Sequence, residues 1–175
     1  MKQLEIEKKF LVTLPIEEIL PRFCFKKNIL QGYFEDEDGE KKRIRLYTDE
    51  RIAEVTTKKL IGYEEGVPIR EEDNSPLDDY YLGLSLLFSS ESIIWKTRYE
   101  FELFPGFIAE VDVFNNLKEP LVVLEVEMFQ EQVKEFNKLV LPSWVGKDIS
   151  DDSKYTNWAL SKSVNTEITI PVDTN

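Results

Sequence analysis

The sequence predicts one mainly β domain of the α+β class, and three observations lead to this prediction. The chain has 175 residues, enough for one domain with a sizeable core. Eight stretches show the apolar and polar patterning of β-strands, whereas helical patterning is confined to three short stretches. The sequence contains neither an internal repeat nor a stretch typical of a domain linker. We therefore expect a single domain over residues 1–163, followed by a flexible tail over residues 164–175.

The eight expected strands are antiparallel and are separated by short polar breaks. Polar or turn-forming residues stand between several neighbours, including Asp49-Glu50, Pro105-Gly106 and Asn115-Asn116. The acidic stretch 35–40 is predicted to be a solvated hairpin tip. The segment 67–73 has the weakest strand pattern. The expected strands cover residues 4–12, 29–34, 41–47, 52–60, 67–73, 93–103, 107–114 and 121–128.

Three short helices are expected around these strands. They cover residues 15–20, 76–87 and 154–161. Pro76 suits the first turn of the second helix, and Asp78 and Asp79 favour its positive end. The run Ser150-Asp-Asp-Ser153 is predicted to cap the third helix.

Composition excludes several classes of protein. Lys plus Arg number 22 and Asp plus Glu 34, so the net charge is −12, which argues against binding a nucleic-acid duplex or anionic lipid. The longest uncharged run, about residues 80–90, is far shorter than the ~20 residues that span a bilayer. A single cysteine, Cys24, favours a reducing cytoplasm. Histidine is absent, so any catalysis must rely on carboxylates, Lys, Arg, Tyr and hard metal ions.

The most informative pattern is charge at every second residue of five expected strands. Side chains at this spacing share one face of a strand. The charged faces are Glu5, Glu7 and Lys9; Arg43 and Arg45; Lys96, Arg98, Glu100 and Glu102; Glu110 and Asp112; Glu125 and Glu127. Each face alone is compatible with simple solvation. However, acidic and basic faces are segregated in the sequence, and like charges at this spacing repel. If the sheet closes into a barrel, these faces could line a polar lumen.

Such a lumen would select its ligand by charge. Buried carboxylates are costly unless cations bind them, and buried Lys and Arg are costly unless anions do. A hard divalent cation takes several oxygen ligands, and a polyanion with closely spaced charges suits Arg and Lys. A complex of a metal ion with a polyphosphate satisfies both sets together.

A series of motifs runs along the chain in a fixed order and begins with Glu5-Ile-Glu7-Lys8-Lys9. The later motifs are Gln31-Gly32-Tyr33, Arg43-Ile-Arg45, Val55-Thr-Thr-Lys58, Lys96-Thr-Arg98-Tyr99, Glu110-Val-Asp112, Leu124-Glu125-Val-Glu127, Trp144-Val-Gly146, Asp151-Asp152 and Lys154-Tyr155-Thr-Asn157. The first motif resembles the amino-terminal ExExK signature of the CYTH domain, or triphosphate tunnel metalloenzyme, family, and the ordered series resembles in particular its short bacterial members. The resemblance extends over about residues 3–161.

The resemblance implies a closed eight-stranded antiparallel β-barrel whose charged tunnel holds a triphosphate group. It also implies a requirement for Mg²⁺ or Mn²⁺. Family members hydrolyse tripolyphosphate, thiamine triphosphate or nucleoside and RNA triphosphates, and one branch cyclises ATP. We expect hydrolysis of a triphosphate, with inorganic tripolyphosphate favoured. The alternatives are a class IV-type adenylate cyclase, a thiamine or nucleoside triphosphatase and a non-catalytic polyphosphate-binding module. The expected partner is a small polyphosphate or nucleotide, and a homodimer is left open.

The resemblance also implies roles for individual residues. The implied metal ligands are Glu5, Glu7, Glu72, Asp112, Glu125 and Glu127. The implied substrate-binding residues are Lys9, Arg43, Arg45, Lys58, Lys96, Arg98 and Lys154. Lys58, Tyr33 and Glu127 are the implied catalytic residues. The chain departs from the family pattern at Asn74, where relatives usually have a second acid, and in a longer, helix-like insertion before Pro142.

Overall fold

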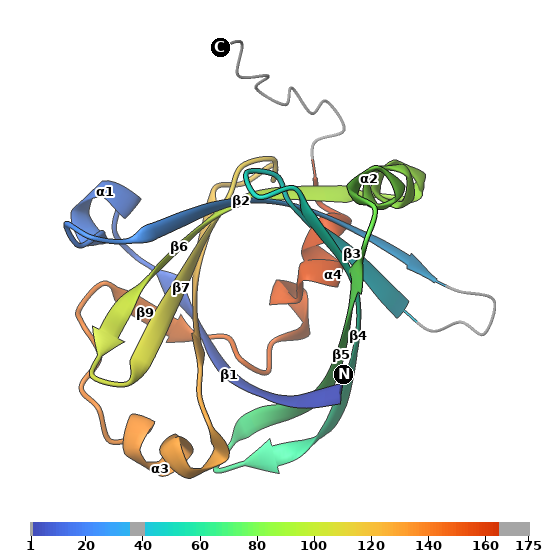
Figure 1. Cartoon of the computed structure of the whole chain (residues 1–175). Helices are drawn as coiled ribbons and strands as arrows, with labels where there is room; N and C mark the ends of the chain where they lie inside the picture. The colour runs from blue at the N-terminus through green and yellow to red at the C-terminus, as the bar shows by residue number, and fades with distance from the viewer. Residues whose placement is uncertain (1, 36–40, 165–175) are drawn as a thin grey trace.

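Eight strands form a closed antiparallel barrel in the computed structural model, which describes residues 2–35 and 41–164. The strands are β1 (Lys2–Val12), β2 (Phe25–Glu35), β3 (Lys41–Tyr47), β4 (Ile52–Glu64), β5 (Val67–Leu77), β6 (Ile93–Phe104), β7 (Phe107–Phe114) and β8 (Leu121–Glu127). Around the ring their order is β1-β5-β4-β3-β2-β6-β7-β8, and β8 pairs with β1 to close it (Figure 1). The predicted fold is thereby confirmed. Residues 36–40 of the expected hairpin tip and 165–175 of the expected tail lie outside the described residues.

The strand register brings the charged faces together on the inner side of the barrel. Glu7 lies opposite Glu127, and Lys9 lies opposite Glu125, where β1 pairs with β8. Arg98 of β6 lies opposite Asp112 of β7. Because side chains alternate along a strand, the apolar residues between these charges point outward. The alternation of side chains along each strand therefore gives the barrel a charged lumen and an apolar exterior. This apolar exterior must be covered by other parts of the chain.

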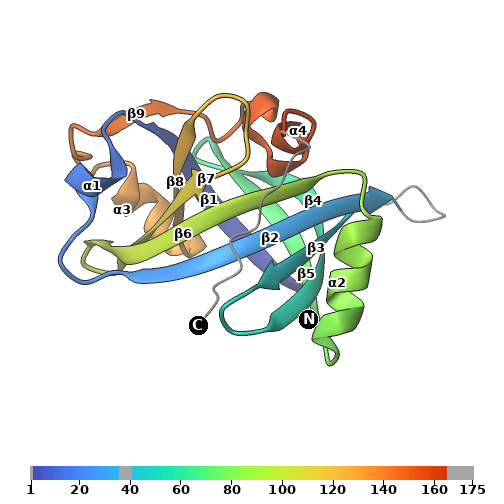
Figure 2. The ribbon, with the colours of Figure 1, turned by 90° about the horizontal axis from the view of Figure 1, so that it is seen from above.

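Short helices supply this cover on two sides of the barrel. The helix α2 (Tyr80–Ser89) packs over an apolar cluster on β2, β3 and β4 (Figure 2). On the other side, α1 (Ile16–Ile19), η1 (Gln130–Gln132) and α3 (Val133–Phe136) lie over β1, β7 and β8. Val133 and Phe136 of the insertion are buried in this outer core, so the insertion packs outside the barrel. No helix in the described part of the chain is long and apolar enough to cross a membrane.

The start of α2 differs from the prediction. Pro76 and Leu77 complete β5, which is longer than the expected segment 67–73, and the helix begins only at Tyr80. Asp79 is its N-cap, and its carboxylate accepts hydrogen bonds from the backbone N–H groups of Tyr81 and Leu82. The strand β5 tolerates Pro76 because this residue lies next to the end of the strand, where the missing backbone N–H donor costs little.

The C-terminal segment enters one end of the barrel. The expected helix over 154–161 is interrupted, because η2 (Ser153–Tyr155) and α4 (Asn157–Ser161) are separate. Asp152 of the predicted capping run caps η2, whereas Thr156 caps α4. Trp158 meets the ring of Tyr33 edge-on at 5.4 Å between ring centroids. Figure 1 shows α4 within the outline of the strand ring. A short strand β9 (Val145–Asp148) pairs with β1 and leads into this segment.

Candidate active site

A cavity runs through the charged lumen in two adjoining sections. The α4 section, of about 290 Å³, is lined in part by Glu7, Tyr33 and Trp158. The distal section, of about 200 Å³, is lined in part by Glu5 and Glu127. The residues that line both sections are Lys9, Arg43, Lys58 and Asn157. The predicted polar lumen is therefore present, and predicted basic residues lie where the two sections meet.

Three of the predicted metal ligands converge in this lumen. Glu5, Glu7 and Glu127 each offer a carboxylate oxygen, and these oxygens lie within 4.8 Å of one another. Glu5 and Glu7 are buried, and Oε2 of Glu5 has no hydrogen-bond partner among the described residues. An all-oxygen set of carboxylates with an unused buried acceptor fits a hard divalent cation such as Mg²⁺ or Mn²⁺. We refer to these three residues as the carboxylate cluster.

Glu127 is the carboxylate of this cluster whose protonation is most perturbed. Loss of solvent inside the barrel, followed by the negative charges of Glu110, Glu5 and Glu7, raises the pKa of Glu127 from 4.5 to about 7. Its side chain nevertheless keeps contact with solvent. A nearby cation would relieve the repulsion, so the arrangement favours metal binding over an ionised but unpaired carboxylate.

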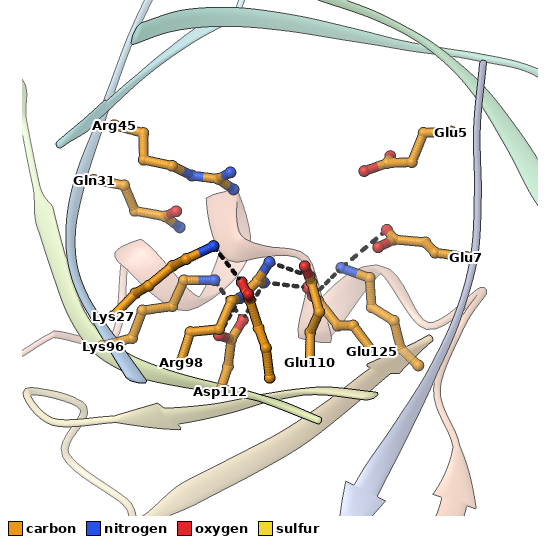
Figure 3. Close-up of polar contacts among 12 residues, drawn as sticks. Glu5, Glu7, Lys27, Gln31, Arg45, Lys96, Arg98, Glu110, Asp112 and Glu125 are labelled. Atoms are coloured by element: carbon orange, nitrogen blue, oxygen red, sulfur yellow. Dashed lines mark hydrogen bonds and ion pairs between the residues drawn. The ribbon is translucent and has the colours of Figure 1, made fainter. Parts of the chain in front are cut away.

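Two other predicted ligands, Asp112 and Glu125, belong to a buried ion-pair network rather than to the carboxylate cluster (Figure 3). Arg98 Nε lies 2.7 Å from Asp112 Oδ1, and Arg98 Nη2 lies 2.6 Å from Glu125 Oε2. Lys96 donates to Asp112, and Arg98 also pairs with Glu110. Both Lys96 and Asp112 are fully buried. Neighbouring charges of opposite sign compensate these buried groups.

The charges of this network explain the protonation of its members. Burial would raise the pKa of Asp112, but Arg98 and Lys96 outweigh it and lower that pKa. Burial and repulsion by Arg98 lower the pKa of Lys96 to about 8. Burial would also raise the pKa of Glu125, but Lys9 and Arg98 hold it well below its usual range. Asp112 and Glu125 therefore stay ionised, and their ion pairs hold Lys96 and Arg98 at one wall of the barrel.

Two lysines connect the carboxylate cluster to its surroundings. Lys9 Nζ lies 2.6 Å from Glu125 Oε1 and 3.2 Å from Glu7 Oε1. Burial alone would lower the pKa of Lys9, but Glu125 and Glu7 raise it above its usual value. Lys58 pairs with Glu5 and lies 3.2 Å from Glu72 Oε1. The Lys9 ammonium group therefore stays charged, and both lysines lie beside carboxylates that fit a metal ion.

The two predicted arginines of β3 present buried donors. Arg43 Nη2 donates to Thr56 Oγ1 at 3.1 Å and to Glu72 Oε1 at 3.2 Å. Arg45 Nη1 donates to Tyr47 Oη at 3.1 Å. The Nε groups of both arginines are buried without a hydrogen-bond partner among the described residues. Such donors suit an anion with several oxygens. Arg45 points into the lumen from the wall opposite Glu5 (Figure 3).

Glu72 lies with these basic groups and outside the carboxylate cluster. Burial would raise the pKa of Glu72, but Lys58 and Arg43 lower it below its usual value. Its carboxylate therefore stays ionised and orients the two cations. Its predicted role as a metal ligand stays a prediction.

Tyr33 and Lys58 both line the α4 section, but their polar partners differ. Tyr33 Oη accepts a hydrogen bond from Gln31 Nε2 at 2.9 Å, whereas Lys58 pairs with Glu5 and Glu72. Burial raises the pKa of Tyr33 to about 12, although Arg43 and Arg45 oppose the change. Tyr33 is therefore a neutral hydrogen-bond donor near pH 7. Lys154 is exposed on η2 and lines neither section.

Sequence reasoning assigned no site role to several residues that line or support the lumen, although the quoted motifs include Gln31, Thr56 and Asn157. Arg70 Nη1 lies 3.3 Å from Glu7 Oε1, and Asn157 lines both sections. Gln31 is fully buried, and Thr56 is almost so. Spacing carried the signal for two of these: Arg70 is two residues before Glu72, and Gln31 two before Tyr33, so each shares a face with a predicted site residue.

Fold and site together define a class of protein. A closed β-barrel encloses carboxylates that fit a hard cation and, beside them, Lys and Arg groups that fit a phosphate oxyanion. The barrel thus belongs to proteins built to hold a metal ion and a polyanion in one tunnel.

Comparisons with known proteins narrow this class. The chain is 32% identical over 163 residues to an inorganic triphosphatase of Acetivibrio thermocellus, covering 91% of this chain and 94% of that protein. It is 30% identical over 162 residues to an inorganic triphosphatase of Nitrosomonas europaea, covering 91% and 98%. A crystal structure of the inorganic triphosphatase NE1496 superposes with a TM-score of 0.64 at 26% identity, covering 91% and 95%. Comparison with models of protein families gives no match. The chain belongs to the CYTH, or triphosphate tunnel metalloenzyme, family.

Proposed function

We propose that this protein is a divalent-metal-dependent triphosphatase whose favoured substrate is inorganic tripolyphosphate. The observation that carries the proposal is the junction of the two cavity sections. There, Lys9 pairs with Glu7 and Lys58 pairs with Glu5, two carboxylates that fit a metal ion, and Arg43 also lines both sections. The similarity to two inorganic triphosphatases supports the same conclusion.

The chain's own groups divide the work of such a reaction. Arg43, Arg45, Lys9 and Lys58 would hold the phosphate oxygens, and Arg98, which lines the distal section, would add a further donor. Lys96 is fully buried against Asp112 and lines neither section, so its predicted role in substrate binding stays a prediction. A cation held by Glu5, Glu7 and Glu127 would neutralise phosphate charge and supply an activated water nucleophile. Tyr33, which keeps its proton near pH 7, would donate a hydrogen bond to a phosphate oxygen. The barrel wall would limit access of bulk water.

A second candidate substrate is a triphosphate that carries an organic group. The α4 section has a partly apolar wall formed by Leu60, Ile149, Tyr155 and Trp158. An aromatic or heterocyclic ring could stack there, as in thiamine triphosphate or a nucleoside triphosphate. Cyclisation of ATP would require attack at the α-phosphorus, and no arrangement of the described residues favours it. A non-catalytic binding module would not need the carboxylate cluster.

The remaining expectations stay predictions. They are the cytoplasmic location, the absence of nucleic-acid partners, the homodimer left open, the choice between Mg²⁺ and Mn²⁺, and the roles of Lys154, Asp112 and Glu125 in substrate or metal binding.

A substrate panel tests the proposal. Phosphate release would be measured from tripolyphosphate, thiamine triphosphate and ATP at equal concentrations with Mg²⁺ and with Mn²⁺, and cyclic AMP would be measured from ATP. We expect kcat/KM to be highest for tripolyphosphate. A higher value for thiamine triphosphate or ATP would shift the assignment to the second candidate. Cyclic AMP as the main product would refute hydrolysis.

A further inference from the structure

Two uncharged residues, Thr56 and Asn74, lie beside the phosphate-binding arginine Arg43 on the inner face of the barrel. Three neighbouring strands place them in a row, because Arg43 of β3 is opposite Thr56 of β4, and Thr56 is opposite Asn74 of β5. Thr56 is only 1% exposed. Asn74 lines the distal section of the cavity. A buried hydroxyl in such a row must find partners among its neighbours.

The hydrogen bonds in this row have a defined direction. A guanidinium group only donates, so Thr56 Oγ1 accepts from Arg43 Nη2 at 3.1 Å. The single hydroxyl hydrogen of Thr56 is then available to Asn74 Oδ1, which lies 2.7 Å away. The chain of bonds therefore runs from Arg43 through Thr56 to the carbonyl oxygen of Asn74. An apolar side chain at position 56 would break both links.

This chain of hydrogen bonds holds one edge of the Arg43 guanidinium group. Nη2 is shared between Thr56 Oγ1 and Glu72 Oε1, while Nε is a buried donor without a partner among the described residues. Arg43 lines both cavity sections. Fixing one edge against Thr56 and Glu72 therefore sets where the remaining donors point.

We infer that Thr56 and Asn74 are positioning residues that hold Arg43 in the orientation in which it grips a phosphate group. This inference rests on the proposed function. The amide at position 74 serves the role better than a carboxylate. It accepts the Thr56 hydrogen bond without adding a further negative charge beside Glu72, where that charge would repel an anionic substrate.

Substitutions at Thr56 with a matched control test the inference. Thr56→Val keeps the shape of the side chain and removes the hydroxyl, whereas Thr56→Ser keeps the hydroxyl. Thr57→Val makes the same change on the outer face of β4. We expect Thr56→Val to raise KM for tripolyphosphate by about tenfold, with kcat within about threefold of the wild type. Thr56→Ser and Thr57→Val should stay near the wild-type KM. A wild-type KM in Thr56→Val overturns the inference.

A double-mutant cycle shows whether Thr56 acts through Arg43. Calorimetric titration with tripolyphosphate and Ca²⁺ gives Kd for the wild type, Thr56→Val, Arg43→Ala and the double variant. We expect Thr56→Val to have little effect on Kd once Arg43 is replaced. An equal loss in both backgrounds overturns the inference, because Thr56 would then act on something else. Melting temperatures of all variants show which of them fold.

Asn74→Ala tests the second link of the chain. It removes the acceptor of the Thr56 hydroxyl, so its effect on Kd should be smaller than that of Thr56→Val and not additive with it. Full additivity would contradict a chain that runs through Asn74. A wild-type protein that neither binds nor hydrolyses tripolyphosphate would overturn the proposed function and the inference together. An active wild type with an unaffected Thr56→Val overturns only the inference.

Discussion

At the residue scale, the charged groups of the lumen largely neutralise one another, and Glu127 is the exception. Lys9, Lys58, Lys96 and Arg98 each lie within ion-pair distance of a carboxylate. Glu127 makes no ion pair with another described residue, and its carboxylate faces those of Glu5 and Glu7. The cost of ionising it is visible in its pKa of about 7. Among the described residues of the lumen, Glu127 is therefore the one whose ionised form would gain most from a bound cation.

The stability of the protein should reveal this cost as a function of pH. The pKa of Glu127 in the folded state, about 7, is above its ordinary value of 4.5. The contribution of Glu127 to the free energy of unfolding is therefore fully favourable below pH 4.5, and it is lost as the pH rises through 7. Glu127→Gln avoids the loss. In the presence of a chelator, the Tm of Glu127→Gln should therefore exceed that of the wild type at pH 8, with a smaller difference at pH 4.5.

The control for this prediction is Glu131→Gln, which changes an exposed carboxylate on η1 outside the barrel. It should shift Tm equally at both pH values. A Tm difference between wild type and Glu127→Gln that does not grow with pH would contradict the assigned pKa of Glu127.

Kinetics should separate the roles of Glu127 and Arg43. Glu127→Gln removes a charge from the carboxylate cluster and should lower kcat by roughly a hundredfold with a modest change in KM. Arg43→Ala removes a group that grips phosphate in the ground state and the transition state, and should raise KM by roughly tenfold or more. Steady-state rates with tripolyphosphate measure both. An unchanged kcat in Glu127→Gln would remove this residue from the catalytic set.

At the element scale, α2 illustrates how packing overrides helix propensity. Gly83 lies within this helix, where glycine is normally less favourable than alanine by about 1 kcal/mol. A Cβ atom at Gly83 would lie 2.5 Å from the Cβ atom of Ala53 on β4. Glycine therefore allows the helix to approach the sheet closely enough to cover its apolar face.

Gly83→Ala should consequently destabilise the protein although it favours the helix. Overpacking of a core costs about 1–3 kcal/mol, which exceeds the gain in propensity at most sites. We expect Tm to fall by roughly 2–6 °C. Gly62→Ala is the matched control, because a Cβ atom there meets nothing within 4 Å. Combining Gly83→Ala with Ala53→Gly should restore part of the loss. A higher Tm for Gly83→Ala would show that α2 can move away from β4.

The elements also show what the sequence could and could not predict. Alternation located the strands, and in five of them it separates an apolar face from a charged face. It failed for Pro76, where a helix signal and the end of a long strand coincide, and the strand continues because β5 pairs with β4 as far as Leu77. The division of the last helix at Thr156 depends on how η2 and α4 fit into the barrel end, and that contact is tertiary.

A local sequence pattern was equally unable to predict which charged residues of the lumen form ion pairs with each other. The family resemblance implied site roles for both Glu5 and Lys58, but they lie 53 residues apart, and only barrel closure brings them together. Asp112 and Glu125 match the carboxylate pattern as well as Glu5 does, yet register aligns them with Arg98 and Lys9. A sequence motif specifies the face of a strand, whereas ring closure and register specify the partner.

At the scale of the whole molecule, the barrel encloses carboxylates that fit a metal ion and basic groups that fit a phosphate, and a metal–polyphosphate complex should stabilise it. Binding to the folded state alone adds about 2.7 kcal/mol at a hundredfold excess over Kd. For a chain of this size, tripolyphosphate with non-turnover Ca²⁺ should therefore raise Tm by about 5–10 °C. Monophosphate at matched ionic strength should do far less, because it spans fewer of the basic groups. Equal Tm values with the two anions would argue against a tunnel that binds a triphosphate group.

The initial rate of phosphate release from tripolyphosphate, measured with Mg²⁺ or Mn²⁺ and then with excess chelator, tests the central claim most directly. The carboxylate cluster and the basic residues beside it predict rapid release with the metal, loss of release with the chelator and recovery when the metal is returned. Full turnover in excess chelator would contradict a metal-dependent mechanism, and no turnover with either metal would contradict the assignment of this tunnel as a triphosphatase site.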